Sequence, residues 1–349
     1  MAVRSGSREC EVSPRRPQTL LVMSPDVLRL QFGQTEMTRL RASASLGDPV
    51  AAHDFGSDRV RERLAEVEVL ITSWGCPPID EDVLSAAPRL KAALHAAGSV
   101  RPHIRDAVFD RGLLVTTAAH VNAEPVAQYT LAAVLWAFKK APFLAMDARV
   151  HRQDWTYREH RGELSGKDRT IVIVGFSRVG RRVVDLLRRL DIGRILVVDP
   201  VVGPAEIHAA GAEHVTLAKA LPQADVLSLH APALPETRHL IGEAELAAMP
   251  PWATLINTAR GSLVDTEALQ RVCARGTLHA ILDVTDPEPL PASSPLYELS
   301  NVTLTPHIAG SLGSETRAMT AATLEELERY AAGLSPLAPV TRHGLAMQA

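Results

Sequence analysis

At 349 residues, with 46% hydrophobic and 22% charged residues, the chain has the composition of a soluble globular protein long enough for two domains. Its formal net charge of -3 excludes the basic surface typical of nucleic-acid binding, and no apolar run approaches the roughly 20 residues of a membrane span. The three cysteines, Cys10, Cys76 and Cys273, are scattered, which favours the reducing cytoplasm and argues against disulfides or a zinc site.

The N-terminal third has the pattern of an α/β domain. Residues 1–18 are polar and lack the apolar segment of a signal peptide, so we expect a disordered tail. Apolar segments with strand character follow, separated by helical patterns, at 19–23, 67–72, 90–95 and 113–116. Short strands that alternate with helices predict parallel βαβ units.

A long helix is expected next, because Ala, Leu and Val recur at helical spacing between Asn122 and Lys140. Asn122 is its expected N-cap, and Pro125 is tolerated in the first turn. This helix could cross from a first domain to a second. Residues 141–166 have no clear periodicity, which predicts a long loop.

Strand patterns return after Thr170. The apolar segments, most of them separated by helical stretches, are 171–175, 195–199, 226–230, 254–257, 280–283 and 302–305. They predict a doubly wound parallel sheet. A final helix at 314–333 is expected to pack back on the first domain, and residues 335–349 are expected to be loosely ordered.

Residues 171–200 have the pattern of a strand, a tight turn, a helix and a second strand that ends at Asp199. The turn from Gly175 to Gly180 is similar to G-x-G-x-x-G, the dinucleotide-binding pattern, with Ser177 in place of the middle glycine. The following helix would offer free N–H groups to a pyrophosphate. The Asp199 carboxylate would bind both ribose hydroxyls and repel a 2′-phosphate, which predicts NAD rather than NADP. The alternative is a tight strand–helix turn of any α/β protein.

Three later segments each end a predicted strand, where ligands bind in open α/β sheets. They are INTARG at 256–261, LDVTDPEP at 282–289 and TPHIAGS at 305–311. Together with HAPALPETRHLI at 230–241, they resemble the signature regions of the D-isomer-specific 2-hydroxyacid dehydrogenase family, in the family's order. The resemblance extends from Thr19 to the last helix.

The resemblance implies a fold with two Rossmann-like or flavodoxin-like α/β domains and an active site in the cleft between them. An NAD-binding domain at 123–311 would be inserted in a substrate-binding domain at 19–122 and 312–337, leaving 338–349 as a C-terminal tail. The family forms homodimers through the NAD-binding domain. The crossing helix and the arm at 140–166, with Trp155, would supply that interface.

The resemblance also implies roles for three residues. Arg260 would bind and polarise the substrate, His307 would be the catalytic acid/base and Glu288 its carboxylate partner. Hydride transfer to a keto carbon puts negative charge on oxygen, and histidine is the natural proton donor near neutral pH. A paired carboxylate holds the ring in orientation and favours its protonated form, while the planar arginine fork suits a substrate carboxylate.

The remaining expected contacts fall into two sets. The cofactor-binding residues implied by the motifs are Gly175, Ser177, Arg178, Val179, Gly180, Asp199, His230, Ala231, Pro232, Thr237, Thr258, Ala259, Arg260, Asp283, His307 and Gly310. The substrate-binding residues are Trp74, Ala97, Gly98, Ser99, Arg260 and His307, with the backbone amides of the glycine loop holding the substrate carboxylate. No metal is expected.

The expected activity is hydride transfer between NAD(H) and a D-2-hydroxy acid/2-keto acid pair. Two alternatives stay open: an NAD(H)-sensing regulatory protein of the same fold, and a dehydrogenase of another small oxyanion such as phosphite. Alternatives also exist for single residues. Arg260 and Glu288 could be solvated loop charges, His307 a satisfied core histidine and Trp74 a packing residue.

Overall fold

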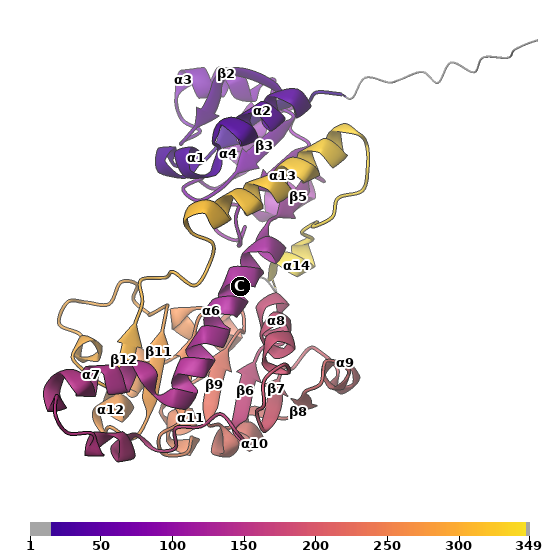
Figure 1. Ribbon diagram of the computed structural model, residues 1–349. Coiled ribbons are helices and arrows are strands. Elements are labelled where there is room, and N and C mark those ends of the chain that lie inside the picture. The colour runs from indigo at the N-terminus through magenta and orange to yellow at the C-terminus, as the bar shows by residue number, and fades with distance from the viewer. Residues whose placement is uncertain (1–14, 347–349) are drawn as a thin grey trace, which may run out of the picture. The chain divides into compact units, whose positions relative to one another are not determined.

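The computed structural model describes residues 15–346, so residues 1–14 of the predicted N-terminal tail and residues 347–349 lie outside it. Within the described range the chain forms two compact units (Figure 1). The first unit comprises the chain up to Ala119 together with Gly313–Leu345, and the second comprises His120–Leu312.

The first unit contains a parallel sheet with the strand order β2-β1-β3-β4-β5 among the described residues. Its strands are β1 (Gln18–Val22), β2 (Ser45–Ala52), β3 (Val69–Thr72), β4 (Ala92–His95) and β5 (Leu114–Thr117). The sequence predicted all of these except β2, which contains Gly47, Asp48 and Pro49. Such residues are depleted in central strands but tolerated at an edge, where β2 lies.

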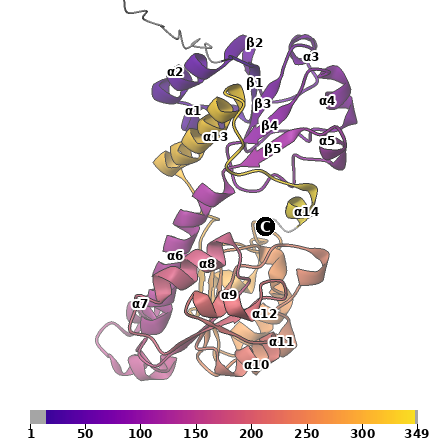
Figure 2. The ribbon, with the colours of Figure 1, turned by 90° about the vertical axis from the view of Figure 1, so that its right-hand side faces the viewer.

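Helices cover both faces of this sheet. They are α1 (Pro25–Gln31), α2 (Gln34–Ser43), α3 (Asp58–Leu64), α4 (Glu81–Ala86), α5 (Asp106–Asp110), α13 (Thr316–Ala331) and α14 (Arg342–Ala346). Helix α13 packs beside α1 and α2 (Figure 2), and its Leu324 and Leu327 share a buried cluster with Leu21 and Leu94. The prediction that the last helix returns to the first domain is therefore confirmed.

The predicted loose order of the C-terminal segment is wrong for residues 338–345. Val340 is buried in the core of the first unit, and its N–H donates to the carbonyl of Val115 at 2.8 Å. Arg342 forms an ion pair with Asp110 at the start of α14. This segment therefore covers the β5 edge of the sheet, which the polar and proline-rich sequence around it did not indicate.

The second unit contains a parallel sheet with the order β12-β11-β10-β9-β6-β7-β8 among the described residues. Its strands are β6 (Thr170–Val174), β7 (Arg194–Val198), β8 (Glu213–His214), β9 (Val226–Leu229), β10 (Thr254–Asn257), β11 (His279–Leu282) and β12 (Val302–Leu304). The predicted doubly wound sheet is confirmed. The two-residue strand β8 is too short for a sequence pattern to predict.

Both faces of this second sheet are buried. In β6, Ile171 and Ile173 belong to one core cluster, while Val172 and Val174 belong to another. Alternate side chains of a strand point to opposite faces, so a strand covered on both sides needs an unbroken apolar run. The crossover helices are α8 (Arg178–Leu187), α9 (Pro204–Ala209), α10 (Leu217–Ala220), α11 (Glu243–Ala248) and α12 (Thr266–Ala274).

The long predicted helix is α6 (Ala119–Lys139), which begins three residues earlier than expected. Asn122 is therefore inside the helix and not its N-cap; its side-chain oxygen accepts the N–H of Ser311 at 2.8 Å. The predicted loop after it is wrong in its first half, where α7 (Ala141–His151) follows directly. Lys140 separates the two helices with a left-handed φ of 50°, and Phe143 is the buried residue of α7.

Short 3-10 helices complete the structure at Thr156–Arg161, Leu221–Gln223, Pro235–Thr237, Gly261–Leu263, Pro295–Tyr297 and Gly313–Glu315. Among residues 15–346, no helix combines the length and the apolar composition that crossing a bilayer requires.

Candidate active site

The segments singled out in the second unit all follow the carboxyl ends of its strands. Because these strands are parallel, their carboxyl ends lie on one edge of the sheet. Residues from the predicted catalytic and cofactor sets follow each of these strand ends: Gly175–Gly180 after β6, Asp199 after β7, His230 after β9, Arg260 after β10, Asp283 after β11 and His307 after β12. The strand order reverses between β6 and β9, which is where open α/β sheets bind ligands.

The turn after β6 forms a cradle that has no room for a side chain at two positions, Gly175 and Gly180. Gly175 has a φ of 96°, and a Cβ there would lie 2.6 Å from the backbone nitrogen of Ala231. A Cβ on Gly180 would lie 2.1 Å from the carbonyl oxygen of Gly175. Both positions therefore require glycine for steric reasons, and the turn leads directly into the N-terminus of α8. This cradle fits a dinucleotide pyrophosphate.

Ser177 has a role in this turn that its sequence position did not indicate. It is the N-cap of α8, and its hydroxyl oxygen accepts the N–H of Gly180 at 3.3 Å. A serine hydroxyl that accepts one hydrogen bond still has its own proton to donate. The substitution in the glycine pattern is thus compatible with both helix capping and donation to a phosphate.

Asp199 ties the end of β7 to the same turn. One carboxylate oxygen accepts the N–H of Phe176 at 2.6 Å, and the other accepts the N–H groups of Val201 and Val202, each at 2.8 Å. The carboxylate is therefore fixed beside the cradle by backbone donors. The oxygen that accepts only the Phe176 N–H has a second lone pair, so the carboxylate can still accept a ribose hydroxyl.

His230 and Thr237 organise the loop after β9. His230 is buried, its Nε2 lies 2.9 Å from the Ser228 hydroxyl, and burial lowers the pKa of its ring to about 3. The ring is neutral near pH 7 for that reason. The Thr237 hydroxyl donates to the carbonyl of Pro232 at 2.6 Å and accepts the N–H of Leu234 at 2.8 Å, which closes the loop.

His307 and Glu288 form a direct pair. Nδ1 of His307 lies 2.5 Å from Oε1 of Glu288, and the side chains are 50% and 41% exposed. Such exposure is incompatible with a core histidine, and the contact shows that Glu288 is not a lone solvated charge. With Nδ1 engaged by the carboxylate, Nε2 is the ring nitrogen suited to exchange a proton with a substrate.

Asp283 holds the turn that carries His307. Asp283 is 2% exposed, and one oxygen of its carboxylate accepts the N–H of Ile308 at 2.8 Å while the other accepts the N–H of Ala309 at 2.9 Å. The His307 N–H donates to the carbonyls of Asp283 and Thr305, both at 3.0 Å. His307 has a left-handed φ of 54°, a conformation that costs about 1–3 kcal/mol and persists only where the surroundings enforce it.

Arg260 follows β10 in a closely packed loop. One guanidinium nitrogen donates to the Ala259 carbonyl at 2.6 Å, and the Asn257 amide donates to the Arg260 carbonyl at 2.9 Å. A Cβ on Gly261 would lie 1.9 Å from the carbonyl oxygen of Thr285. Gly261 thus lets the loop of Arg260 approach the loop that leads to Glu288.

Several residues that organise this edge had not been singled out from the sequence. Asn257 braces the arginine loop, the Thr305 hydroxyl donates to Asp283 at 2.6 Å, and the Tyr129 hydroxyl lies 2.7 Å from that of Thr305. Asn257 and Thr305 could have been singled out as polar residues at strand ends. Tyr129 gave no such signal, because a tyrosine in an apolar helix is indistinguishable from a packing residue.

The predicted substrate-binding residues of the first unit follow β3 and β4, which are neighbours in the first sheet. Trp74 is 36% exposed, more than a packing residue of the core would be. The Ala97 carbonyl accepts the Thr117 hydroxyl and the Ala118 N–H, each at 3.1 Å, and the Gly98 carbonyl also accepts from Thr117. These bonds occupy backbone carbonyls of the loop formed by Ala97, Gly98 and Ser99. The backbone N–H groups of this loop are suited to bind an anion.

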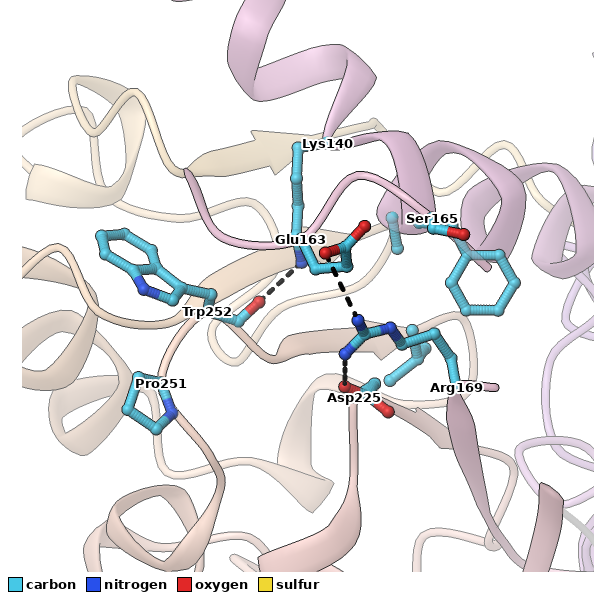
Figure 3. A pocket seen from close by; sticks show the side chains of 10 residues that line it. Lys140, Glu163, Ser165, Arg169, Asp225, Pro251 and Trp252 are labelled. Atoms are coloured by element: carbon cyan, nitrogen blue, oxygen red, sulfur yellow. Dashed lines mark hydrogen bonds and ion pairs between the residues drawn. The ribbon is translucent and has the colours of Figure 1, made fainter. Parts of the chain in front are cut away.

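A polar pocket also lies at the opposite, amino edge of the second sheet (Figure 3). Nζ of Lys140 donates to the Trp252 carbonyl at 2.6 Å and to the Thr254 hydroxyl at 3.1 Å, and burial lowers the Lys140 pKa to about 8. Arg169 pairs with Asp225 at 3.0 Å and with Glu163 at 3.8 Å. Charges that already pair within the protein make this pocket a poorer ligand site than the carboxyl edge.

No group of three or more His, Cys, Asp or Glu side chains that could hold a metal ion occurs in the part of the chain that the structure describes. The two described cysteines, Cys76 and Cys273, are free and buried, and burial raises the pKa of each thiol to about 12. They are therefore protonated and unreactive near neutral pH.

Comparisons with known proteins agree with this geometry. Residues 132–309 match the model for the D-isomer specific 2-hydroxyacid dehydrogenase, NAD binding domain. A glyoxylate reductase from Korarchaeum cryptofilum is 35% identical over 270 residues, which cover 76% of this chain and 80% of that protein. A D-3-phosphoglycerate dehydrogenase from Mycobacterium bovis is 34% identical over 273 residues, 77% of this chain but 50% of that longer protein.

Among solved structures, a protein from Thermus thermophilus superimposes with a TM-score of 0.73 at 31% identity, covering 93% of this chain and 100% of that chain. The range that matches the family model contains Asp199, Arg260, Glu288 and His307. The chain belongs to the D-isomer specific 2-hydroxyacid dehydrogenase family, and it is an NAD-binding oxidoreductase that acts on the CH–OH group of its donor.

Proposed function

We propose that this protein transfers a hydride between NAD(H) and a D-2-hydroxy acid/2-keto acid pair, with His307 as the acid/base. The observation that carries this proposal is the 2.5 Å pair of His307 with Glu288 at the strand edge that also bears Arg260 and the dinucleotide cradle. An exposed histidine held by a carboxylate is an arrangement suited to proton transfer to a carbonyl oxygen.

When bound, the nicotinamide would supply the hydride. As the keto oxygen gains negative charge, Nε2 of His307 donates a proton to it, and Glu288 at Nδ1 balances the positive charge of the ring. In the opposite direction, the neutral ring accepts the hydroxyl proton. Because Nδ1 is committed to Glu288, the tautomer and the direction of the ring are fixed before substrate binds.

Arg260 binds and polarises the substrate in this proposal. Its planar guanidinium can form a bidentate contact with a carboxylate and approach the adjacent carbonyl. The backbone N–H groups of Ala97, Gly98 and Ser99 in the first unit are also proposed to bind the substrate carboxylate, which the engagement of the loop carbonyls by Thr117 supports. Trp74 would contact the side chain of the substrate.

The coenzyme would be held by residues along the carboxyl edge of the second sheet. The pyrophosphate would bind at Gly175–Gly180 and the N-terminus of α8, through Ser177, Arg178 and Val179. Asp199 would accept the ribose hydroxyls and disfavour NADP. The other proposed contacts are His230, Ala231, Pro232, Thr237, Thr258, Ala259, Asp283 and Gly310.

The substrate is the open part of the proposal, since the two relatives described above are named for different substrates, glyoxylate and 3-phosphoglycerate. A panel of 2-keto acids with side chains of increasing size, assayed with NADH at the coenzyme absorbance, tests the proposal. We expect turnover with at least one keto acid and a product of D configuration. Tight NADH binding without turnover of any keto acid would favour the sensing alternative. Reduction of NAD by phosphite would favour the oxyanion alternative.

We also propose a homodimer through the second unit. Large apolar side chains are exposed along α6, α7 and the following segment: Leu135 (43%), Trp136 (56%), Met146 (45%), Val150 (77%) and Trp155 (66%). Several large apolar side chains exposed within one short stretch of the chain favour an interaction surface. Sedimentation analysis should give the mass of a dimer, and Trp136→Glu should shift it toward the monomer. A wild-type monomer at micromolar concentration would contradict this.

The buried thiols of Cys76 and Cys273 suit the cytoplasm, which is the compartment that we propose.

A further inference from the structure

Helix α6 contacts the segment that carries His307 on both sides of that residue. The Tyr129 hydroxyl lies 2.7 Å from the Thr305 hydroxyl, and Asn122 accepts the N–H of Ser311 at 2.8 Å. Positions 122 and 129 are seven residues apart, about two helical turns, so they lie on one face of α6. We propose that this face of α6 positions His307, with Tyr129 as its main positioning residue. The inference rests on the proposed function, since it assumes His307 as the acid/base.

The direction of the hydrogen bonds can be assigned. The Thr305 hydroxyl donates its single proton to the carboxylate of Asp283 at 2.6 Å. Its oxygen can then only accept, so the Tyr129 hydroxyl is the donor of the bond between them. Burial raises the pKa of Tyr129 above its usual value, which keeps this hydroxyl protonated and able to donate.

The chain of donors ends on the backbone around His307. Tyr129 donates to Thr305, Thr305 donates to Asp283, and the Asp283 carboxylate holds the N–H groups of Ile308 and Ala309. His307, which lies between Thr305 and Ile308 in the chain, has a strained, left-handed φ. A strained turn relaxes when its supports are removed, and a small displacement of an acid/base group lowers the rate of proton transfer.

The other end of the segment is equally close to α6. A Cβ on Gly310 would lie 3.3 Å from Oδ1 of Asn122, so the backbone of the segment approaches the helix closely there. The Thr305 and Ser311 contacts therefore bracket His307, and from the backbone between them its ring reaches Glu288.

The test is Tyr129→Phe in the full-length protein, assayed with NADH and an active 2-keto acid. We expect kcat to fall about 5- to 10-fold, the effect of one net hydrogen bond, with unchanged KM and unchanged NADH dissociation constant. The isotope effect with deuterated NADH should rise, because the transfer step becomes slower. Hydrogen exchange of the peptide spanning 305–310 should become faster.

Two further variants separate positioning from packing. Thr305→Ser keeps the hydroxyl and should behave as wild type, whereas Thr305→Val should lose at least as much kcat as Tyr129→Phe. Tyr297→Phe is the matched control: Tyr297 lies in the same unit, and its hydroxyl donates to the Leu290 carbonyl at 3.3 Å. We expect no change in kcat or in the exchange of residues 305–310.

Unchanged kcat and exchange in Tyr129→Phe would overturn the inference, and so would an equal loss in Tyr297→Phe. If His307→Ala is inactive while Tyr129→Phe is fully active, the positioning role alone fails and the proposed function stands. Full turnover by His307→Ala would overturn both.

Discussion

Glu288 and His307 are 19 positions apart in the chain, yet Oε1 of the first lies 2.5 Å from Nδ1 of the second. They belong to the loops that follow β11 and β12, which are neighbours in the second sheet. The parallel pairing of two short strands therefore brings the pair together. Asp283, the first residue of the loop after β11, holds the turn that carries His307 and so ties the two loops together. The close approach of Gly261 to Thr285 braces the loop that leads to Glu288.

Glu288→Gln tests the contribution of the carboxylate charge. The amide is similar in size but cannot balance a positive ring, so kcat should fall about 10- to 100-fold, within the range of acid/base contributions. The NADH dissociation constant should not change. Glu298→Gln, an exposed glutamate of the same unit, is the control. Equal kcat in Glu288→Gln and wild type would mean that the 2.5 Å contact has no catalytic role.

Gly261→Ala tests the close approach of the two loops. The added Cβ would lie 1.9 Å from a backbone oxygen that cannot rotate away, so we expect a loss of about 1–3 kcal/mol in the free energy of unfolding, as for other overpacked sites. Displacement of Arg260 should also raise KM for the keto acid. Gly203→Ala is the matched control, because a Cβ there meets no atom within 4 Å. A neutral Gly261→Ala variant would contradict the packing argument.

Ser177→Gly tests the altered position of the glycine pattern. Glycine is almost as good an N-cap as serine, so the free energy of unfolding should change by only a few tenths of a kcal/mol. Ser177→Ala should cost about 1 kcal/mol, because it removes the acceptor for the Gly180 N–H. An unchanged NADH dissociation constant in Ser177→Gly would show that the hydroxyl is a tolerated substitute. Tighter binding than wild type would show that serine obstructs the pyrophosphate.

Buried histidines should make the fold sensitive to acid. Burial lowers the pKa of His95, His230 and His279 from 6.5 to about 3. Below pH 6.5 the unfolded chain binds protons at these rings while the folded protein does not. The contribution of the neutral rings to the free energy of unfolding is therefore fully present above pH 6.5. It is lost as pH falls from 6.5 toward 3, by up to about 1.4 kcal/mol per pH unit for each proton.

Urea unfolding between about pH 7.5 and 4.5 measures this dependence. His279→Phe keeps an aromatic ring between Phe143 and Trp252, with which His279 makes ring contacts, but it removes one titrating group. Its stability should fall less steeply with decreasing pH than that of wild type. His53→Gln, at an exposed position, should leave the slope unchanged. An identical slope in His279→Phe would contradict the assignment of a neutral buried ring.

The second sheet could be predicted from the sequence because its strands are buried on both faces. Segments such as TIVIV in β6 and VLSL in β9 are short, continuous and almost wholly apolar. Apolar runs of this length are typical of buried strands and too short for a helix. Edge strand β2 was missed because its Gly47, Asp48 and Pro49 are breakers in any local pattern. Its pairing with β1 is a tertiary effect.

The catalytic candidates could be predicted because each follows a strand end in a recognisable motif. Their supports could not, since those depend on contacts between distant parts of the chain. Tyr129 and Thr305 are 176 residues apart. The sequence pattern predicts Asn122 as a helix N-cap, whereas the earlier start of α6 places it inside the helix, where it accepts the N–H of Ser311. The sequence likewise predicts a loop after Lys140 where α7 forms, because the single buried residue of α7, Phe143, leaves no helical pattern of apolar residues to detect.

The most direct test of His307 as the acid/base is the turnover of His307→Ala with NADH and a 2-keto acid that the wild-type protein reduces. We expect kcat to fall about 10²- to 10⁴-fold, the range expected for an acid/base group, while the NADH dissociation constant stays at the wild-type value. Turnover equal to that of wild type with every active keto acid would contradict it.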